Sequence, residues 1–456
     1  MKRYYLLLSF VIAFTQAVSS QCWTHVSGGA NHAVALKSDG SLWAWGKNDA
    51  GQLGNGTFEN QTTPVKVGEA TNWRQVSAGG DHTMAIKNDG TLWAWGQNIY
   101  GQLGNDSYDN TSEPLQIGTD NDWQTVSAGS IFTLALKNDG SLWSWGWNDH
   151  YELGTGDTQN RTAPVQIGDA NDWESISAST LSATAIKKNH SIWTWGANVE
   201  GALGSVILQF QEIPSQVGPM VFNYKKTSSG GYTSLNIKLD GSLWGWGFNG
   251  YGTVGNGTNS NVPFPVQIDD DNDWDSAVTS ISVTRAIKNN GTLWVWGKNN
   301  LGQLGDGSLT NKNYPVQIGQ EQLWKEVSGR KDFTIALDDN SNIWAWGENT
   351  YGQLGNGTTS HANIPIMIES NCSLKTAEAE KTAALTIYPN PVNSVLYIKS
   401  SNGALDHVII SDISGKKVLE KTTDLTAIDV QYLQSGVYIL RGFRNGESYR
   451  QKFIKR

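Results

Sequence analysis

The sequence of 456 residues has few cysteines and histidines, and each scarcity excludes a class of protein. Its two cysteines, Cys22 and Cys372, are too few for a disulfide-rich scaffold or a cysteine-ligated zinc finger. The seven histidines include no pair three to five residues apart, so no zinc-hydrolase motif is present. The chain also lacks a Gly-x-Ser-x-Gly elbow. We therefore predict no catalytic residue, no metal site and no cofactor.

Long apolar runs are also scarce, and the one at the N-terminus has the pattern of a secretory signal. Lys2 and Arg3 precede a mostly apolar run, residues 4–14, that is short for a membrane span. Small residues follow, which predicts a signal peptide over 1–20 and a mature chain that begins near Gln21. We expect an exported protein with no transmembrane segment in its mature form.

Basic residues are few in the body of the chain. Residues 21–384 contain 21 Lys and Arg against 36 Asp and Glu, whereas residues 385–456 contain ten against six. An acidic body repels the phosphate backbone of nucleic acids, so we expect no nucleic-acid partner.

Tryptophan is abundant, with 21 residues, and most of them follow one period. A Trp-x-Trp-Gly segment occurs seven times at steps of 50 or 51 residues, with its first tryptophan at Trp43, Trp93, Trp143, Trp193, Trp244, Trp294 and Trp344. A constant period of this length indicates one supersecondary unit copied seven times. Six further tryptophans and Tyr224 stand about twenty residues before each pair, and only Trp147 lies outside the pattern.

Each copy predicts four short antiparallel strands. In the second copy they are Trp73–Ala78, His82–Lys87, 92–95 and 114–117. An Asp-Gly turn joins the second strand to the third, because Asp-Gly supplies the positive φ angles of a tight hairpin. Four strands in each of seven copies predict an all-β protein with a seven-bladed β-propeller.

The repeated residues also resemble a known family. Val-Ser-Ala-Gly-x-x-His-Thr followed by Asp-Gly-x-Leu-Trp-x-Trp-Gly-x-Asn-x-x-Gly-Gln-Leu-Gly resembles the regulator-of-chromosome-condensation repeat over residues 23–370. The resemblance implies a seven-bladed propeller. Its eukaryotic founder is a nucleotide exchange factor, but the acidic body and the export signal argue against that activity here.

After the propeller, predicted over 21–373, and a linker over 374–384, the sequence changes character. Residues 385–456 alternate apolar and polar positions between Gly and Asn turns, which predicts a small C-terminal β-sandwich. Its Tyr-Pro-Asn-Pro start and Lys-Phe-Ile-Lys-Arg end resemble the type A sorting domain of the type IX secretion system. That resemblance implies a Bacteroidetes-type source, the secretion machinery as a partner, and a location in the medium or on the cell surface, reached through the periplasm. An ordinary adhesive sandwich is the alternative.

The seven copies differ most in two connections, the turn between strands one and two and the loop between strands three and four. Both fall at the same end of an antiparallel blade, so they converge on one face, where rigid strands hold them. Aromatic residues there are candidates to bind a ligand: Tyr100, Phe132, Trp147, His150, Tyr151, Tyr232, Phe248, Tyr251, Phe333 and Tyr351.

This pattern favours an exported binding module for a protein or a glycan. The alternatives are a secreted, carbohydrate-active enzyme, a secreted protein inhibitor, or loops that vary because nothing constrains them. An acidic run, residues 269–273, is interpreted as a solvated turn in preference to a Ca²⁺ site.

The spacing of the two cysteines predicts a disulfide that closes the ring. Seven repeats advance the chain by about 351 residues, which places Cys22 and Cys372 beside the same blade junction. An exported protein meets oxidising conditions that permit the bond, whose loop-entropy contribution reaches roughly 5 kcal/mol. Mass spectrometry of a non-reduced digest should find the two cysteines in one linked peptide. A free Cys22 thiol in native protein would contradict the prediction.

Overall fold

The computed structural model describes residues 22–205, 209–218, 223–319, 322–369, 385–400, 403–412, 417–444 and 447–456. They form two compact units, one within Ser19–Leu374 and the other within Lys375–Arg456. The predicted signal peptide, the predicted linker and Cys372 lie outside the described residues. Over the part of the chain that is described, no helix is both long and apolar enough to cross a membrane.

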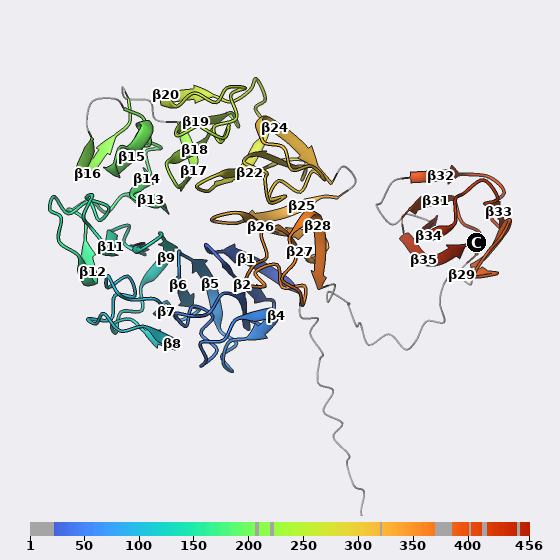
Figure 1. Ribbon diagram of the computed structural model, residues 1–456, viewed down its shortest axis with the longest axis horizontal. Helices are drawn as coiled ribbons and strands as arrows, with labels where there is room; N and C mark the ends of the chain where they lie inside the picture. Colours follow the sequence, from blue (N-terminus) through green and yellow to red (C-terminus); the bar gives the residue numbers. More distant parts are fainter. Residues whose placement is uncertain are drawn as a thin grey trace, which may run out of the picture. The chain divides into compact units, whose positions relative to one another are not determined.

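The first unit is a seven-bladed β-propeller, as predicted (Figure 1). Each blade is a four-stranded antiparallel sheet built from one continuous stretch of chain. Blades one to three comprise β1 (Trp23–Gly28), β2 (His32–Lys37), β3 (Leu42–Gly46), β4 (Gln61–Lys66); β5 (Trp73–Ala78), β6 (His82–Lys87), β7 (Leu92–Gly96), β8 (Thr111–Gln116); β9 (Trp123–Ala128), β10 (Phe132–Lys137), β11 (Leu142–Gly146) and β12 (Arg161–Gln166).

Blades four to seven repeat the arrangement. They comprise β13 (Trp173–Ala178), β14 (Ser182–Lys187), β15 (Ile192–Ala197), the 3₁₀ turn η1 (Val199–Gly201), β16 (Phe210–Gln216); β17 (Tyr224–Gly230), β18 (Thr233–Lys238), β19 (Leu243–Gly247), β20 (Val262–Gln267); β21 (Trp274–Thr279), β22 (Val283–Lys288), β23 (Leu293–Gly297), β24 (Lys312–Ile318); β25 (Trp324–Ser328), β26 (Phe333–Asp338), β27 (Ile343–Gly347) and β28 (Ala362–Glu369).

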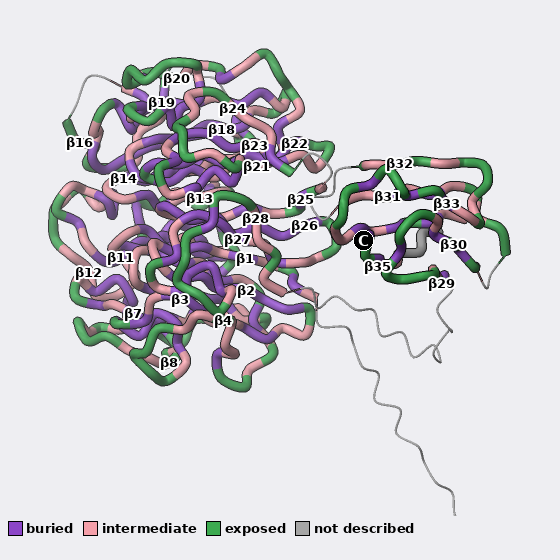
Figure 2. The backbone as a smooth tube through the Cα atoms, turned by 45° about the vertical axis from the view of Figure 1, so that its right-hand side comes forward, coloured by how far each residue is buried: buried purple, intermediate pink, exposed green. Residues whose placement is uncertain are grey.

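Burial falls from the second strand of each blade to the fourth. Strand β2 is buried throughout, whereas the outer strand β4 is intermediate or exposed (Figure 2). The outer strand of blade one contains Pro64, and the corresponding strand of every other blade also has a proline. Proline lacks a backbone N–H, so it suits a strand whose outer edge has no pairing partner.

The second tryptophan of each pair joins neighbouring blades. Trp95 is fully buried, and its indole N–H donates to the carbonyl of Gln52 in blade one at 3.0 Å. Six of the seven tryptophans at this position make the same bond to the preceding blade. The indole also lies over Gly54, where an added Cβ would stand 2.6 Å from the ring nitrogen. This contact explains the second glycine of the Gly-Gln-Leu-Gly segment.

The first tryptophan of each pair is only half-buried, and a lysine covers it. In blade three, the Lys137 ammonium lies 4.8 Å from the ring centre of Trp143 and 4.9 Å from that of Trp123. Cation–π attraction stabilises such a stack. Six blades have this lysine, and blade seven has Asp338 instead, whose carboxylate accepts from the Trp344 indole at 2.9 Å.

The ring closes by packing blade seven against blade one. The backbone N–H of Gly28 donates to Ser328 Oγ at 3.0 Å, and Trp45 donates to the carbonyl of Gln353 at 3.0 Å. His25 Nδ1 lies 2.6 Å from a Glu326 carboxylate oxygen. Noncovalent closure thus uses the same contacts as the other junctions, and the Cys22–Cys372 bond remains a prediction.

The second unit is a β-sandwich, as predicted. One sheet pairs β29 (Leu385–Tyr388), β30 (Val395–Ser400) and β33 (Ala427–Asp429), and the other pairs β32 (Lys417–Lys421), β31 (His407–Asp412), β34 (Gly436–Arg444) and β35 (Glu447–Lys455). Apolar side chains from both sheets form one core, which includes Leu396, Ile410, Ile428, Leu440 and Phe453.

Candidate functional site

The two variable connections lie at the same end of each blade. In blade one, His32 at the start of β2 pairs with Gly46 at the end of β3, and Gly46 pairs with Gln61 at the start of β4. The turn before β2 and the loop before β4 therefore open on one face of the propeller, which we term the loop face.

An asparagine, buried in six of the seven blades and half-buried in blade four, bonds to the long loop of each blade. The Oδ1 atom of Asn148 accepts from the backbone N–H of Leu153 at 2.9 Å, and its Nδ2 atom donates to the carbonyl of Asp157 at 2.7 Å. Every blade has an asparagine at this position whose Oδ1 accepts from the backbone N–H five residues later. The loop that carries the candidate aromatic residues is therefore fixed by hydrogen bonds within itself.

Four of the predicted residues meet in one row on the loop face. Tyr100 of blade two lies 5.8 Å from Trp147 of blade three, measured between ring centres, and Trp147 lies 5.2 Å from His150. Phe210 of blade four continues the row, 5.7 Å from His150 and 5.9 Å from Tyr151. All five rings are partly exposed. We term these residues the aromatic ledge; it crosses three blades.

Phe210 is a ledge residue that was missing from the predicted set. It stands where five other blades have an asparagine and one has a histidine, whose side chains accept from the first backbone N–H of the loop. In blade four the Gln209 carbonyl takes over that bond to Asn198, which frees position 210 for a phenyl ring. An aromatic residue at an asparagine position was the signal in the sequence.

The other predicted residues lie apart from the ledge. Phe248 and Tyr251 of blade five pack 5.8 Å apart, with the Lys298 ammonium 5.8 Å from the Tyr251 ring centre. Tyr351 of blade seven lies 6.0 Å from the Lys47 ammonium, and Tyr232 is partly exposed in the turn before β18.

The prediction that Phe132 and Phe333 offer their rings to a ligand needs correction. Both are fully buried and belong to the hydrophobic cores of their blade junctions. They begin the second strand, where the side chain points between blades; His32 and His82 occupy the same position and are also fully buried. Neither phenylalanine belongs to the loop face.

Arg330 crosses the middle of the propeller. Its guanidinium donates to the carbonyl of Ala128 in blade three at 2.8 Å and to that of Ser179 in blade four at 2.7 Å. Burial lowers its pKa to about 10, so it stays protonated at neutral pH. Arg330 of blade seven therefore links that blade to blades three and four.

Glu152 is a buried acid beneath the ledge. Four other blades have a glutamine here, whose side-chain oxygen accepts from the backbone N–H two residues earlier. Glu152 accepts in the same way from His150 at 2.9 Å, and its other oxygen lies 3.3 Å from His150 Nδ1. Its side chain has no exposed surface, and burial raises its pKa to about 7.

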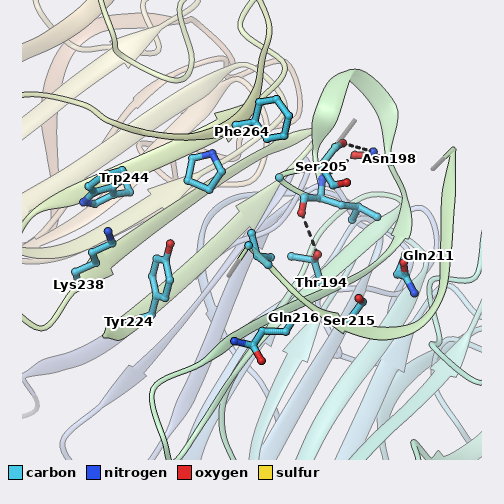
Figure 3. Close-up of a pocket in the computed structure, with 15 residues that line it drawn as sticks. Thr194, Asn198, Ser205, Gln211, Ser215, Gln216, Tyr224, Lys238, Trp244 and Phe264 are labelled. Atoms are coloured by element: carbon cyan, nitrogen blue, oxygen red, sulfur yellow. Dashed lines mark hydrogen bonds between the residues drawn. The ribbon is translucent and has the colours of Figure 1, made fainter. Parts of the chain in front are cut away.

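A cavity of about 550 Å³ lies between blades four and five (Figure 3). Lys238, Trp244 and Tyr224 line one side of it, and Thr194 and Gln211 lie across from them. Sequence reasoning missed this cavity, although Tyr224 was the one departure from the tryptophan period.

Within the described residues, no group of three or more histidine, cysteine or acidic side chains could hold a metal ion. The acidic run over 269–273 pairs with a lysine: Lys288 lies 2.9 Å from Asp273 and also contacts Asp271.

Three family models match the chain. The regulator of chromosome condensation (RCC1) repeat matches residues 39–86, 89–136, 139–186, 240–284, 290–337 and 340–378, and a second model of this repeat matches 23–52, 73–102 and 123–152. The chain belongs to the RCC1 repeat family. Its C-terminal unit matches the secretion system C-terminal sorting domain over residues 386–456, so this RCC1-repeat protein is secreted or attached to the cell surface.

Individual relatives support the fold alone. The ultraviolet-B receptor UVR8 of Arabidopsis thaliana is 44% identical over 52 residues, 11% of this chain and 12% of that protein. The structure of human WBSCR16 is 21% identical with a TM-score of 0.63, over 69% of this chain and 86% of that one. Prp20p of Saccharomyces cerevisiae is 17% identical with a TM-score of 0.66, over 80% and 90%.

Replacement of Glu152 by glutamine is expected to stabilise the RCC1-repeat propeller in a pH-dependent way. The folded pKa lies above the ordinary value of 4.5, so the fold disfavours the ionised form. This penalty is absent below pH 4.5, grows until about pH 7 and is constant above it. Urea unfolding at pH 8 should show a gain of up to about 3 kcal/mol, which vanishes at pH 4.

The reciprocal change Gln102→Glu serves as the control, because Gln102 occupies the same position in blade two. It should introduce a loss of stability over the same pH range. Equal pH dependence in wild type and Glu152→Gln would contradict the assignment of a buried acid.

Proposed function

We propose that this protein is an exported binding module whose aromatic ledge recognises a glycan. The row of five rings across blades two to four carries the proposal. The ring planes are tilted against one another by 35° to 76°, so each partly exposed ring can contact the apolar C–H face of a different sugar in a chain. Four of the five rings also bear a polar atom, which can bond to sugar hydroxyls while the ring stays in contact.

The setting of the ledge supports binding in preference to catalysis. The loops that bear it are fixed by their asparagines, so little conformational entropy is lost when a ligand binds. A glycosidase needs two carboxyl groups on opposite sides of the scissile bond. Glu152 is the buried acid beneath the ledge, and its side chain is fully covered. The carbohydrate-active enzyme is therefore less favoured.

The ledge can be tested with the mature full-length protein and a panel of insoluble and soluble polysaccharides. The double variant Trp147→Ala, Phe210→Ala removes the middle of the ledge and should weaken binding by about 30-fold or more, the size of a hot-spot loss. The variant Phe248→Ala, Tyr251→Ala removes the other aromatic pair of the same face and is the matched control.

Retention of wild-type affinity in the ledge variant, or an equal loss in the control, would refute the ledge as the binding surface. If the protein binds cell-surface proteins and no polysaccharide, the proposal of a glycan ligand is wrong, but the proposal of a binding module stands.

We propose that the C-terminal unit directs the protein to the type IX secretion machinery. Deletion of residues 385–456 should leave a folded propeller in the periplasm, since the two units have separate cores. Cell fractionation and immunoblotting would locate it. Export of the truncated protein at the wild-type level would contradict this role.

A further inference from the structure

The junction between blades four and five is built differently from the other six. Tyr224 occupies the position that holds a tryptophan in every other blade. Ser215 of the neighbouring outer strand replaces a larger apolar residue, which is Val65, Leu115, Val165, Val266, Val316 or Ile366 in the other blades. Both changes remove side-chain volume at one place. The core cluster of this junction has five buried members: Ile186, Ile192, Val217, Tyr224 and Trp246.

The cavity of Figure 3 lies at this junction, and Tyr224 and Ser215 both line it. It extends from exposed Phe264 on the outer strand to the buried side chains of Tyr224 and Leu203. Grooves of about 500 and 530 Å³ lie at the junctions of blades six and seven and of blades seven and one, and Trp43 lines the second. Neither is lined by a stacked lysine or by the residue that corresponds to Tyr224. The matched ranges of the repeat family leave out residues 187–239, which include most of these substituted positions.

Lys238 lines the cavity and forms no ion pair with an acidic side chain of the described residues, although Asp240 acts on it at longer range. The Lys238 ammonium lies 3.4 Å from the ring centre of Trp244 and 5.5 Å from that of Tyr224. Four of the other five stacked lysines form ion pairs; for example, Lys137 lies 2.6 Å from Asp120, and Lys187 lies 2.9 Å from Asp172.

Six lysines stack on tryptophans in this way. Within the described residues, Lys87 and Lys238 are the two of them that have no acidic ion-pair partner. Burial lowers the pKa of both. Lys87, however, belongs to a blade in which Trp73 fills the corresponding position. Both lysines therefore stack on aromatic rings without an ion-pair partner, but of the two only Lys238 lines the cavity of Figure 3.

We propose that this cavity binds a small organic carboxylate that bears an aromatic ring. The carboxylate would pair with Lys238, and the ring would pack between Trp244, Tyr224 and Phe264. The volume of about 550 Å³ is that of a small-molecule pocket. The amide oxygen of Gln211 on the opposite side can accept a hydrogen bond from a second polar group of the ligand, since its amide nitrogen donates to the Ile213 carbonyl. This site is separate from the ledge and does not depend on the glycan proposal.

Isothermal titration of the full-length protein with indole-3-acetate and phenylacetate tests the site, with the matching amides as neutral controls. We expect the acids to bind with a Kd of about 1 mM or tighter, and the amides to bind at least tenfold more weakly. Failure of both acids to bind would overturn the proposal.

Three variants locate the site. Lys238→Met keeps an apolar chain over Trp244 without the charge and should weaken binding at least tenfold. Tyr224→Trp restores the residue of the other blades, fills the cavity and should abolish binding. Lys87→Met removes the other unpaired lysine and should leave affinity unchanged. Thermal unfolding of each variant establishes that it is folded.

Undiminished binding to folded Lys238→Met or Tyr224→Trp, or an equal loss in Lys87→Met, would place the acids elsewhere and refute the site. The ledge variant Trp147→Ala, Phe210→Ala should bind the acids normally, so the two proposals fail independently.

Discussion

The bond from a buried indole N–H to a loop carbonyl of the preceding blade is the contact on which the propeller depends. Trp95 reaches Gln52, and five equivalent tryptophans reach the preceding blade in the same way. An indole buried without such a partner would lose its hydrogen bond to water at a cost of about 1–3 kcal/mol. The accepting loop must approach closely, which is why a glycine lies under each ring. One contact therefore fixes both the spacing between blades and the composition of the loop.

The same loop carries the face on which a ligand can be recognised. The backbone of the loop accepts the indole bond and is held by the asparagine. Side chains between these positions, such as Trp147 and Tyr151, are partly exposed and belong to the ledge. Structural and variable residues alternate within fewer than twenty positions. A surface residue such as Tyr100 can change without effect on the junction, because the bonds that hold the junction come from the backbone.

Features that recur in every copy were predictable from the sequence. The tryptophan period and the strand pattern within each copy indicated seven four-stranded blades, and the alternation in the tail indicated the sandwich. Contacts that depend on direction were not. Phe132 and Phe333 were expected on the surface, but the register of the second strand turns them between blades. The lysine stacks also escaped prediction, because the lysine and its two tryptophans are separated along the chain and meet only in the folded blade.

Departures from the repeat could be read in the sequence, but their structural effects could not. Glu152 differs from glutamine by one atom, and only its burial makes that difference a shifted pKa. Phe210 and Tyr224 each break a period, yet one adds a ring to a surface and the other lines a cavity. The outcome depends on whether the position points outward or into a junction, which requires the three-dimensional arrangement.

Every blade is formed by consecutive residues, so no sheet mixes the two ends of the propeller. A blade can thus acquire its hydrogen bonds as soon as about fifty residues have been delivered, and most junctions form with the neighbour that arrives next. Blade one is the exception, because the face that bears Trp23 waits for blade seven, some three hundred residues later. During that interval an apolar surface meant for the interior is open to solvent and to other chains. Blade one is synthesised first and can fold first. Its apolar face is nevertheless the one that stays exposed longest, until blade seven closes the propeller.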